Sequence, residues 1–147
     1  RKPLLIMVLF CCFCLSTNAQ SPGEYPSLVG EWILNFDKSW LTISEDGRAM
    51  FDSLDEEKQE SMKVNYKNKS LIITEGSQFE LIQNNSVVSS GSWEIVLYEG
   101  ADYLVLNGDS GGQKSFKIID VTTTGLELGV VSPKGMTSLL KKWVFNK

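Results

Sequence analysis

Apolar and polar side chains alternate with a period of two along most of the chain after residue 28. In the run GEWILNF, Trp32, Leu34 and Phe36 fall on one face, and the residues between them fall on the other. A period of two is typical of a β-strand with one buried face. Runs of this kind recur about every 8–12 residues with turn-forming residues between them, and this spacing indicates an all-β barrel or sandwich.

The other predicted strands are short apolar runs bounded by Gly, Asn, Asp or Ser. They cover residues 40–44, 48–54, 62–66, 71–74, 79–82, 87–98, 103–108, 114–121, 126–131 and 138–145. Asp46-Gly47 has the composition of a tight hairpin turn, and the polar run 55–60 is expected to be a solvated connection. The pattern contains no convincing amphipathic helix. We therefore predict an all-β fold, a single antiparallel up-and-down β-barrel of about eight to ten strands.

Two of these strands carry a glycine two residues before a tryptophan, at Gly30 and Trp32 and again at Gly91 and Trp93. A large ring folded over a close approach of the backbone closes one end of a small barrel. We therefore expect these four residues to form a structural end-plug. A binding site, if the barrel has one, is expected at the opposite mouth. The segments after the two motifs do not align further, so no internal duplication is predicted.

The first residues have the three-part layout of a cleaved secretory signal peptide. Arg1 and Lys2 are basic, an apolar run follows, and small polar residues end at Ala19. The apolar run is shorter than the roughly 20 residues that span a bilayer as a helix. We expect cleavage after Ala19, no stable membrane insertion afterwards, and a periplasmic or extracellular location. The alternatives are a buried N-terminal helix and a lipid anchor on a cysteine.

The lipid anchor is disfavoured because none of the three cysteines follows the small residues that a bacterial lipoprotein signal requires: Cys11, Cys12 and Cys14. After the signal (1–19), residues 20–27 are polar with two prolines and are predicted to form a flexible leader. Residues 28–147 are predicted to form the barrel domain.

Composition narrows the chemistry of this domain. All three cysteines lie in the predicted signal, so no disulfide, thiolate nucleophile or cysteine metal ligand is expected in the barrel. The chain has no histidine, which excludes Ser-His-Asp chemistry and histidine zinc sites. The formal net charge is −4, which argues against nucleic acid or an anionic membrane surface as a partner. We predict a monomeric protein that is not an enzyme and has no metal or cofactor.

Three short motifs occur in a fixed order: Leu28-Val29-Gly30-Glu31-Trp32, Asp46-Gly47 and Gly91-Ser92-Trp93. In this order the chain resembles the compact bacterial lipocalin-like domains, and the similarity covers about residues 28–146. The resemblance implies a barrel whose closed end is covered by a tryptophan. It also implies that a basic residue of the last strand stacks over this ring, here Lys141 or Lys142 beside Trp143. It implies the fold more than any ligand.

Alternation alone assigns a heavily apolar set of side chains to the barrel interior. The set is Trp32, Leu34, Phe36, Phe51, Val64, Tyr66, Phe79, Leu81, Trp93, Ile95, Leu97, Tyr103, Val105, Phe116, Ile118, Leu126, Leu128, Trp143 and Phe145. Such a set either fills the barrel completely or leaves a pocket for one small molecule. A pocket is expected at the open mouth, lined by Tyr66, Phe79 and Tyr103.

Arg48 is the only arginine after Arg1 and follows the predicted Asp-Gly turn. It is expected either at an exposed rim or as a bidentate clamp for a carboxylate or phosphate at the barrel mouth. The acidic residues between 52 and 60 lack the spacing of a calcium loop and are expected to be solvated. The predicted function is therefore non-catalytic binding of a small apolar or amphipathic ligand. The alternative is a closed barrel that acts as a protein-interaction or inhibitor module through its loops.

Overall fold

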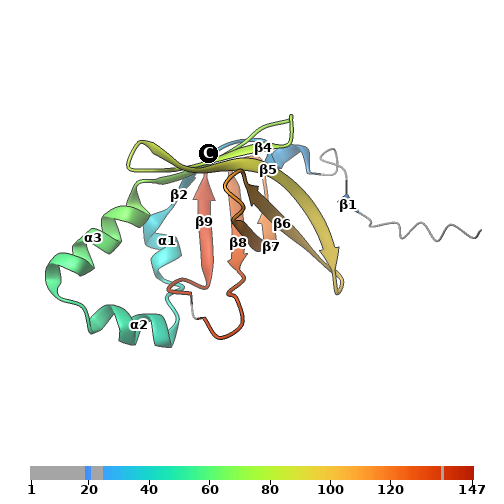
Figure 1. Ribbon diagram of the computed structural model, residues 1–147. Helices are drawn as coiled ribbons and strands as arrows, with labels where there is room; N and C mark the ends of the chain where they lie inside the picture. Colours follow the sequence, from blue (N-terminus) through green and yellow to red (C-terminus); the bar gives the residue numbers. More distant parts are fainter. Residues whose placement is uncertain (1–18, 21–24, 137) are drawn as a thin grey trace, which may run out of the picture.

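The computed structural model describes residues 19–20, 25–136 and 138–147. Eight antiparallel strands, β2 to β9, form a closed up-and-down barrel in which each strand pairs with the next and β9 pairs with β2 (Figure 1). This confirms the all-β barrel predicted from the alternation. Apart from Ala19, the predicted signal peptide lies outside the described residues.

The barrel strands are β2 (Gly30–Leu34), β3 (Lys69–Ile73), β4 (Gln78–Gln83), β5 (Ser86–Tyr98), β6 (Ala101–Gly108), β7 (Gln113–Val121), β8 (Gly125–Val130) and β9 (Lys142–Asn146). A two-residue strand, β1 (Ala19–Gln20), pairs with Ile95 and Val96 of β5, beyond Ser92, where the pairing of β5 with the first residue of β4 stops. The helices are the 3-10 turn η2 (Pro26–Leu28), α1 (Phe36–Trp40), α2 (Glu45–Asp52) and α3 (Glu56–Lys67). Two of the three residues of η2, assigned to the leader from the sequence, thus belong to the folded domain.

The three α-helices correct the sequence prediction, which assigned strands to residues 40–44, 48–54 and 62–66. Each helix begins at a polar residue whose side chain accepts a hydrogen bond from a backbone N–H of the first turn. Asn35 accepts from Lys38 at 3.0 Å, Ser44 from Gly47 at 2.9 Å, and Asp55 from Lys58 at 2.9 Å. Asp46-Gly47 is therefore the first turn of α2 and not a hairpin. The acidic run after Asp55 begins α3 and is not a loop.

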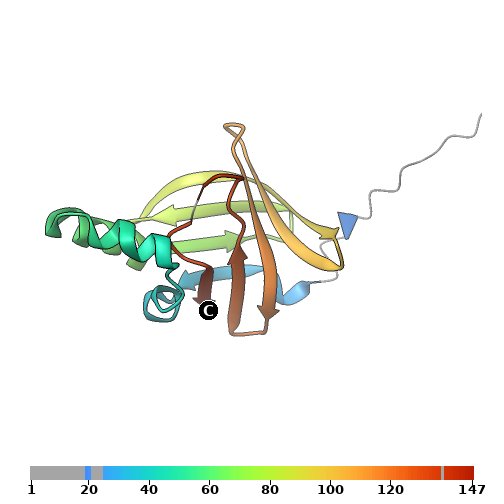
Figure 2. The ribbon, with the colours of Figure 1, turned by 90° about the horizontal axis from the view of Figure 1, so that it is seen from below.

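The helices lie together on one side of the barrel, and η2 lies on the other (Figures 1 and 2). An aromatic cluster joins them, because the ring of Trp40 packs edge-on against Phe51 at 5.0 Å and Tyr66 at 6.4 Å. We call the adjacent opening the helical mouth; there β2 ends, β3 begins at Lys69, β7 begins at Gln113 and β9 begins at Lys142. The other opening is the plugged end.

The core inside the barrel follows the predicted alternation on most strands, including the buried Trp32, Phe79, Ile95 and Phe116. Leu97, near the end of β5, was predicted to be inward but is 47% exposed. Strand β6 departs from the predicted alternation altogether. Leu104 and Leu106 are the inward residues, since they pair with Ile95 and Trp93 of β5. The predicted inward residues Tyr103 and Val105 therefore lie on the outer face. The run Tyr-Leu-Val-Leu has no polar position, so its pattern could not indicate which face is inside.

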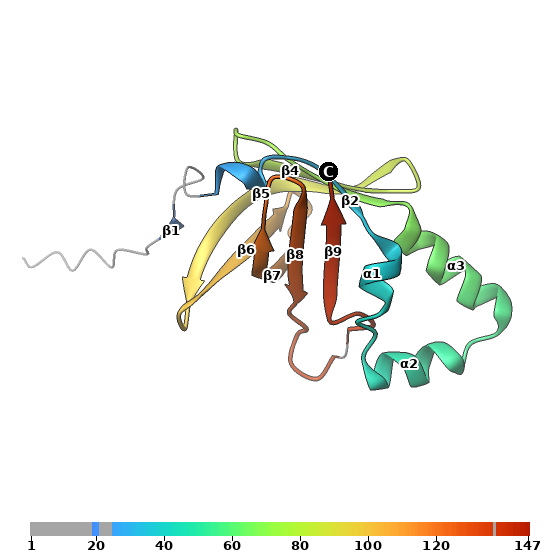
Figure 3. The same ribbon diagram turned by 180° about the vertical axis from the view of Figure 1, so that it is seen from behind.

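Helix α1 seals the seam between the first and last strands. Only Ile33 and Leu34 of β2 pair with β9. Beyond them, the Ser39 hydroxyl accepts a hydrogen bond from Val144 N–H at 2.9 Å, and Asn35 N–H donates to Val144 O at 2.7 Å. Figure 3 shows α1 directly beside β9. A side chain of the helix thus replaces the missing strand partner.

Ser39→Ala should lower the free energy of unfolding by about 1–3 kcal/mol, because it leaves the Val144 N–H without its partner in a buried place. The Ser39 side chain is 0% exposed. Urea unfolding followed by circular dichroism measures the change. Ser61→Ala, on the exposed surface of α3, is the matched control and should change the stability by less than about 0.5 kcal/mol. Equal effects of the two substitutions would contradict a stabilising role for the hydrogen bond between Ser39 and Val144.

Candidate functional site

At the plugged end, Trp32 covers the barrel and is 0% exposed. Its indole N–H donates to Leu28 O in η2 at 2.7 Å, and Lys147 Nζ lies 4.6 Å from the centroid of its ring. Lys147 also donates to Val29 O at 3.0 Å. Gly30 has φ +142°, and a Cβ there would lie 2.8 Å from Lys147 Cε. Glycine is therefore favoured by the backbone conformation, and a larger residue would also displace the end of the Lys147 side chain.

The basic residue over Trp32 is thus Lys147, and the expectation of Lys141 or Lys142 in that place was wrong. Strand β9 reaches β2 with its C-terminal end, where Asn146 pairs with Ile33. Lys141 and Lys142 lie at the other end of the strand, where Lys141 is exposed and Lys142 forms an ion pair with Glu127 at 3.8 Å. Only the residue after the strand can reach the plug.

The tryptophan of the second Gly-x-Trp motif also belongs to the plugged end. The indole N–H of Trp93 donates to Thr74 O, in the turn between β3 and β4, at 3.0 Å. Gly91 instead pairs with Gly108, the last residue of β6, and a Cβ at Gly91 would lie 1.9 Å from Asn107 O, so no larger residue fits there. Trp143, predicted with this group, instead lies at the helical mouth near the start of β9.

A cavity of about 500 Å³ opens at the helical mouth. It arises because β7 and β8 stop pairing at Phe116 and Val130, while β7 continues along β6 to Gln113. The chain after β8 turns away and leaves a wedge beside β7. The wedge is lined by Gln113, Lys114, Ser115, Phe116, Val130, Val131, Ser132, Pro133 and Trp143.

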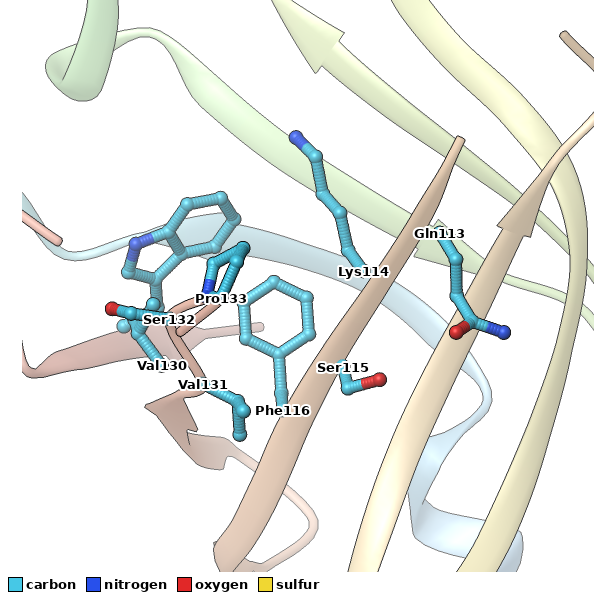
Figure 4. A pocket seen from close by; sticks show the side chains of 9 residues that line it. Gln113, Lys114, Ser115, Phe116, Val130, Val131, Ser132 and Pro133 are labelled. Atoms are coloured by element: carbon cyan, nitrogen blue, oxygen red, sulfur yellow. The ribbon is translucent and has the colours of Figure 1, made fainter. Parts of the chain in front are cut away.

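The floor of this cavity is aromatic. The buried rings of Phe116 and Trp143 lie with their centroids 5.0 Å apart. Figure 4 shows Lys114 and Phe116 on the side of β7 that faces Pro133, with Gln113 and Ser115 turned the other way. The cavity therefore combines an apolar base with a cationic side chain at its rim.

A second lysine stands over the same floor. Lys69, the first residue of β3, precedes the inward residues Leu71 and Ile73 by the strand period. Its Nζ lies 4.5 Å from the ring centroid of Trp143 and 4.8 Å from that of Tyr66. Burial, and then repulsion from Lys114, lowers the pKa of Lys69 to about 8. Burial also raises the pKa of the Tyr66 phenol.

Among the four predicted ligand-site residues, only Tyr66 lies at the helical mouth near this floor, and it reaches it from α3 and not from a strand. Phe79 is buried on β4 and lines a smaller hollow of about 100 Å³. Tyr103 lies on the outer face of β6, where it packs against Tyr98 at 6.3 Å. Arg48 is exposed on α2 and does not line the cavity.

The two lysines were missed from the sequence, although the chain contains a signal for them. Both Lys69-Ser70-Leu71 and Lys114-Ser115-Phe116 place a lysine two residues before an inward apolar residue at the start of a strand. Such a lysine points to the same face as the core residue that follows. Strand-start lysines are ordinarily interpreted as solvated, and only the barrel closure shows that these two lie at one mouth.

Fold and cavity together define the class of protein as a closed antiparallel β-barrel with one plugged end and one open, aromatic mouth. Comparisons of the chain with protein-family models, with curated proteins and with solved structures gave no match. Within residues 19–20, 25–136 and 138–147, no helix has the length and apolarity needed to cross a bilayer. In the same part of the chain, Asp and Glu side chains form no cluster that could hold a metal ion.

Proposed function

We propose that this barrel binds a small amphipathic molecule at the helical mouth and carries out no catalytic step. The observation that supports this most directly is the cavity of about 500 Å³, which lies within the roughly 300–1,000 Å³ usual for small-molecule sites. The cavity and Trp32 lie at opposite openings of the barrel. The opening with Trp32 is closed by η2 and Lys147, and the opening with the cavity is not.

The apolar part of the ligand is proposed to lie against Phe116 and Trp143. Phe116 and Trp143 are only 3% and 8% exposed, and the small area that they present loses little conformational freedom on binding, because both side chains are already packed. Val130, Val131 and Pro133 extend this surface along the wall of the wedge. A non-catalytic role is supported by the sequence, which contains no histidine.

The alternative, a protein-interaction module, has one observation in its favour. Leu41 and Met136 are 85% and 68% exposed, and both lie in connections near the helical mouth. Contiguous apolar patches mark surfaces that contact partners, whereas single exposed apolar side chains are common on any protein, so these two residues give the alternative little support. Mass spectrometry of small molecules that co-purify with the protein separates the two proposals, since a protein-interaction module should retain none.

Val131→Trp should lower the affinity for N-phenylnaphthylamine, a neutral dye that fluoresces in apolar sites, by about tenfold or more. The larger ring would occupy the wedge and leave too little room for the dye. Fluorescence titration measures the affinity. The matched control is Val87→Trp on β5, since Val87 is 54% and Val131 46% exposed; its affinity should stay within about twofold. The proposal fails if the wild-type protein does not bind the dye saturably, or if both variants behave alike.

A further inference from the structure

Two ammonium groups at the helical mouth, those of Lys69 and Lys114, are not paired with any described carboxylate. We infer that the ligand of this mouth carries an anionic head group, a carboxylate or a phosphate, held between Lys69 and Lys114. This inference rests on the proposed function, because it names the chemistry of the molecule that would occupy the same cavity.

The ion pairs in the described part of the chain involve other lysines. Lys58 pairs with Asp55 at 2.7 Å, Lys63 with Glu60 at 3.2 Å, and Lys142 with Glu127 at 3.8 Å. Those lysines lie on exposed surfaces or on an outer face, where water would solvate them in any case. Neither lysine at the barrel mouth has an acidic partner among the described residues, and Lys69, which is half-buried, needs one more than the exposed Lys114 does. A lysine that is partly removed from water is costly unless an opposite charge compensates it.

The surroundings of Lys69 show why its charge is costly to bury. Its ammonium group is flanked by the rings of Trp143 and Tyr66, and the charged group that acts on it most is Lys114. Burial, and then repulsion from the Lys114 ammonium group, lowers the pKa of Lys69. An anion between the two groups would offset the cost of burial with an opposite charge and would screen the repulsion.

The geometry also joins the charged and apolar parts of the site. Trp143 lies under Lys69 and forms the cavity floor with Phe116, while Lys114 lines the same cavity. A ligand whose tail covers Phe116 therefore has its head within reach of the lysines. The charge is local, because the whole chain carries a formal net charge of −4. A single anionic head group fits this small basic site, whereas a polyanion would meet an acidic protein around it.

The test uses a matched pair of dyes, anilinonaphthalene sulfonate and N-phenylnaphthylamine, which differ by the sulfonate group. The wild-type protein should bind the sulfonate more tightly than the neutral dye by about tenfold or more, as expected for charge-assisted contacts. Lys69→Met and Lys114→Met should each weaken sulfonate binding by about tenfold and leave the neutral dye within about twofold. Lys117→Met, exposed on the outer face of β7, is the control and should change neither affinity.

The outcomes separate the inference from the function on which it rests. If neither dye binds, the proposed function fails. If both dyes bind equally and the lysine variants do not differ from Lys117→Met, the cavity binds ligand but the anionic head group is refuted. Should Lys69→Met not fold, Lys114→Met still decides, because its side chain is exposed. Competition by dodecanoate or dodecyl phosphate, with dodecanol as the neutral competitor, then identifies which head group is preferred.

Discussion

Trp32→Ala should lower the free energy of unfolding by about 3–5 kcal/mol, the largest loss that we expect from one substitution in this barrel. The ring is 0% exposed, its indole N–H is bonded to Leu28 O, and Lys147 lies over its face. Removing it opens a cavity at the plugged end, leaves Leu28 O without its donor and removes the ring under Lys147. Urea unfolding followed by far-ultraviolet circular dichroism measures the loss.

Tyr98→Ala is the control for Trp32→Ala, because Tyr98 is 60% exposed at the end of β5. It should cost less than about 1 kcal/mol. If Trp32→Ala also costs less than about 1 kcal/mol, the tryptophan does not close the barrel and the plugged end has been misidentified.

Lys69→Met should change the stability in the opposite direction from Trp32→Ala. It should raise the free energy of unfolding at pH 7 by about 1–2 kcal/mol, allowing for solvent screening of a partly exposed group. Methionine keeps the length of the side chain and its contacts with the rings of Trp143 and Tyr66, but it removes a poorly solvated charge. A residue that destabilises the fold at its own position is typical of a functional site. Binding of the proposed anion would explain why a lysine occupies this position.

The pH dependence of this effect follows from the pKa of Lys69, which folding lowers from 10.5 to about 8. Below pH 8 the lysine is protonated in both states, so the folded protein carries the full cost of the buried charge. Between about pH 8 and 10.5 the folded state has lost the proton and the unfolded state has kept it, so wild-type stability rises with pH. The groups facing the ammonium are Tyr66 and Lys114, and neither supplies a negative charge at pH 7.

The advantage of Lys69→Met over the wild-type protein should therefore shrink as the pH rises from 8 to 10.5. Chemical unfolding at pH 7 and at pH 9.5, with Lys117→Met as the control, measures this change. A constant difference between the two proteins over this range would contradict the lowered pKa. Equal stability at pH 7 would contradict the cost assigned to the charge.

The barrel could be predicted because apolar and polar residues alternate clearly along its strands. The same pattern of alternation also occurs in the helices, which were therefore predicted as strands. In Met62-Lys63-Val64-Asn65-Tyr66, Met62 and Tyr66 share a face both in a strand and in a helix, where they are one turn apart. Val64 distinguishes the two structures, since a strand would bury it with them. In α3 it is 42% exposed, while Met62 and Tyr66 pack against the core.

The candidate site was harder to predict, because it depends on the register between strands. Phe116 and Trp143 were placed in the interior by their alternation, and both are indeed buried. Nothing local indicates that β7 and β8 separate after Phe116, or that this separation leaves a cavity. Lys69 and Lys114 are 45 positions apart in the chain, and only closure of the barrel brings them to one mouth. Arg48, the basic residue that the sequence emphasised, lies on a helix that the alternation did not predict.

The most direct test of the account is where a ligand binds, and the indole N–H resonances of the tryptophans report it. The chain has four tryptophans, of which Trp143 lies at the helical mouth and Trp32 at the plugged end. Titration of the labelled protein with N-phenylnaphthylamine should shift the Trp143 resonance progressively and leave that of Trp32 unchanged. A shift of Trp32 with Trp143 unmoved would place the ligand at the other end and contradict the account.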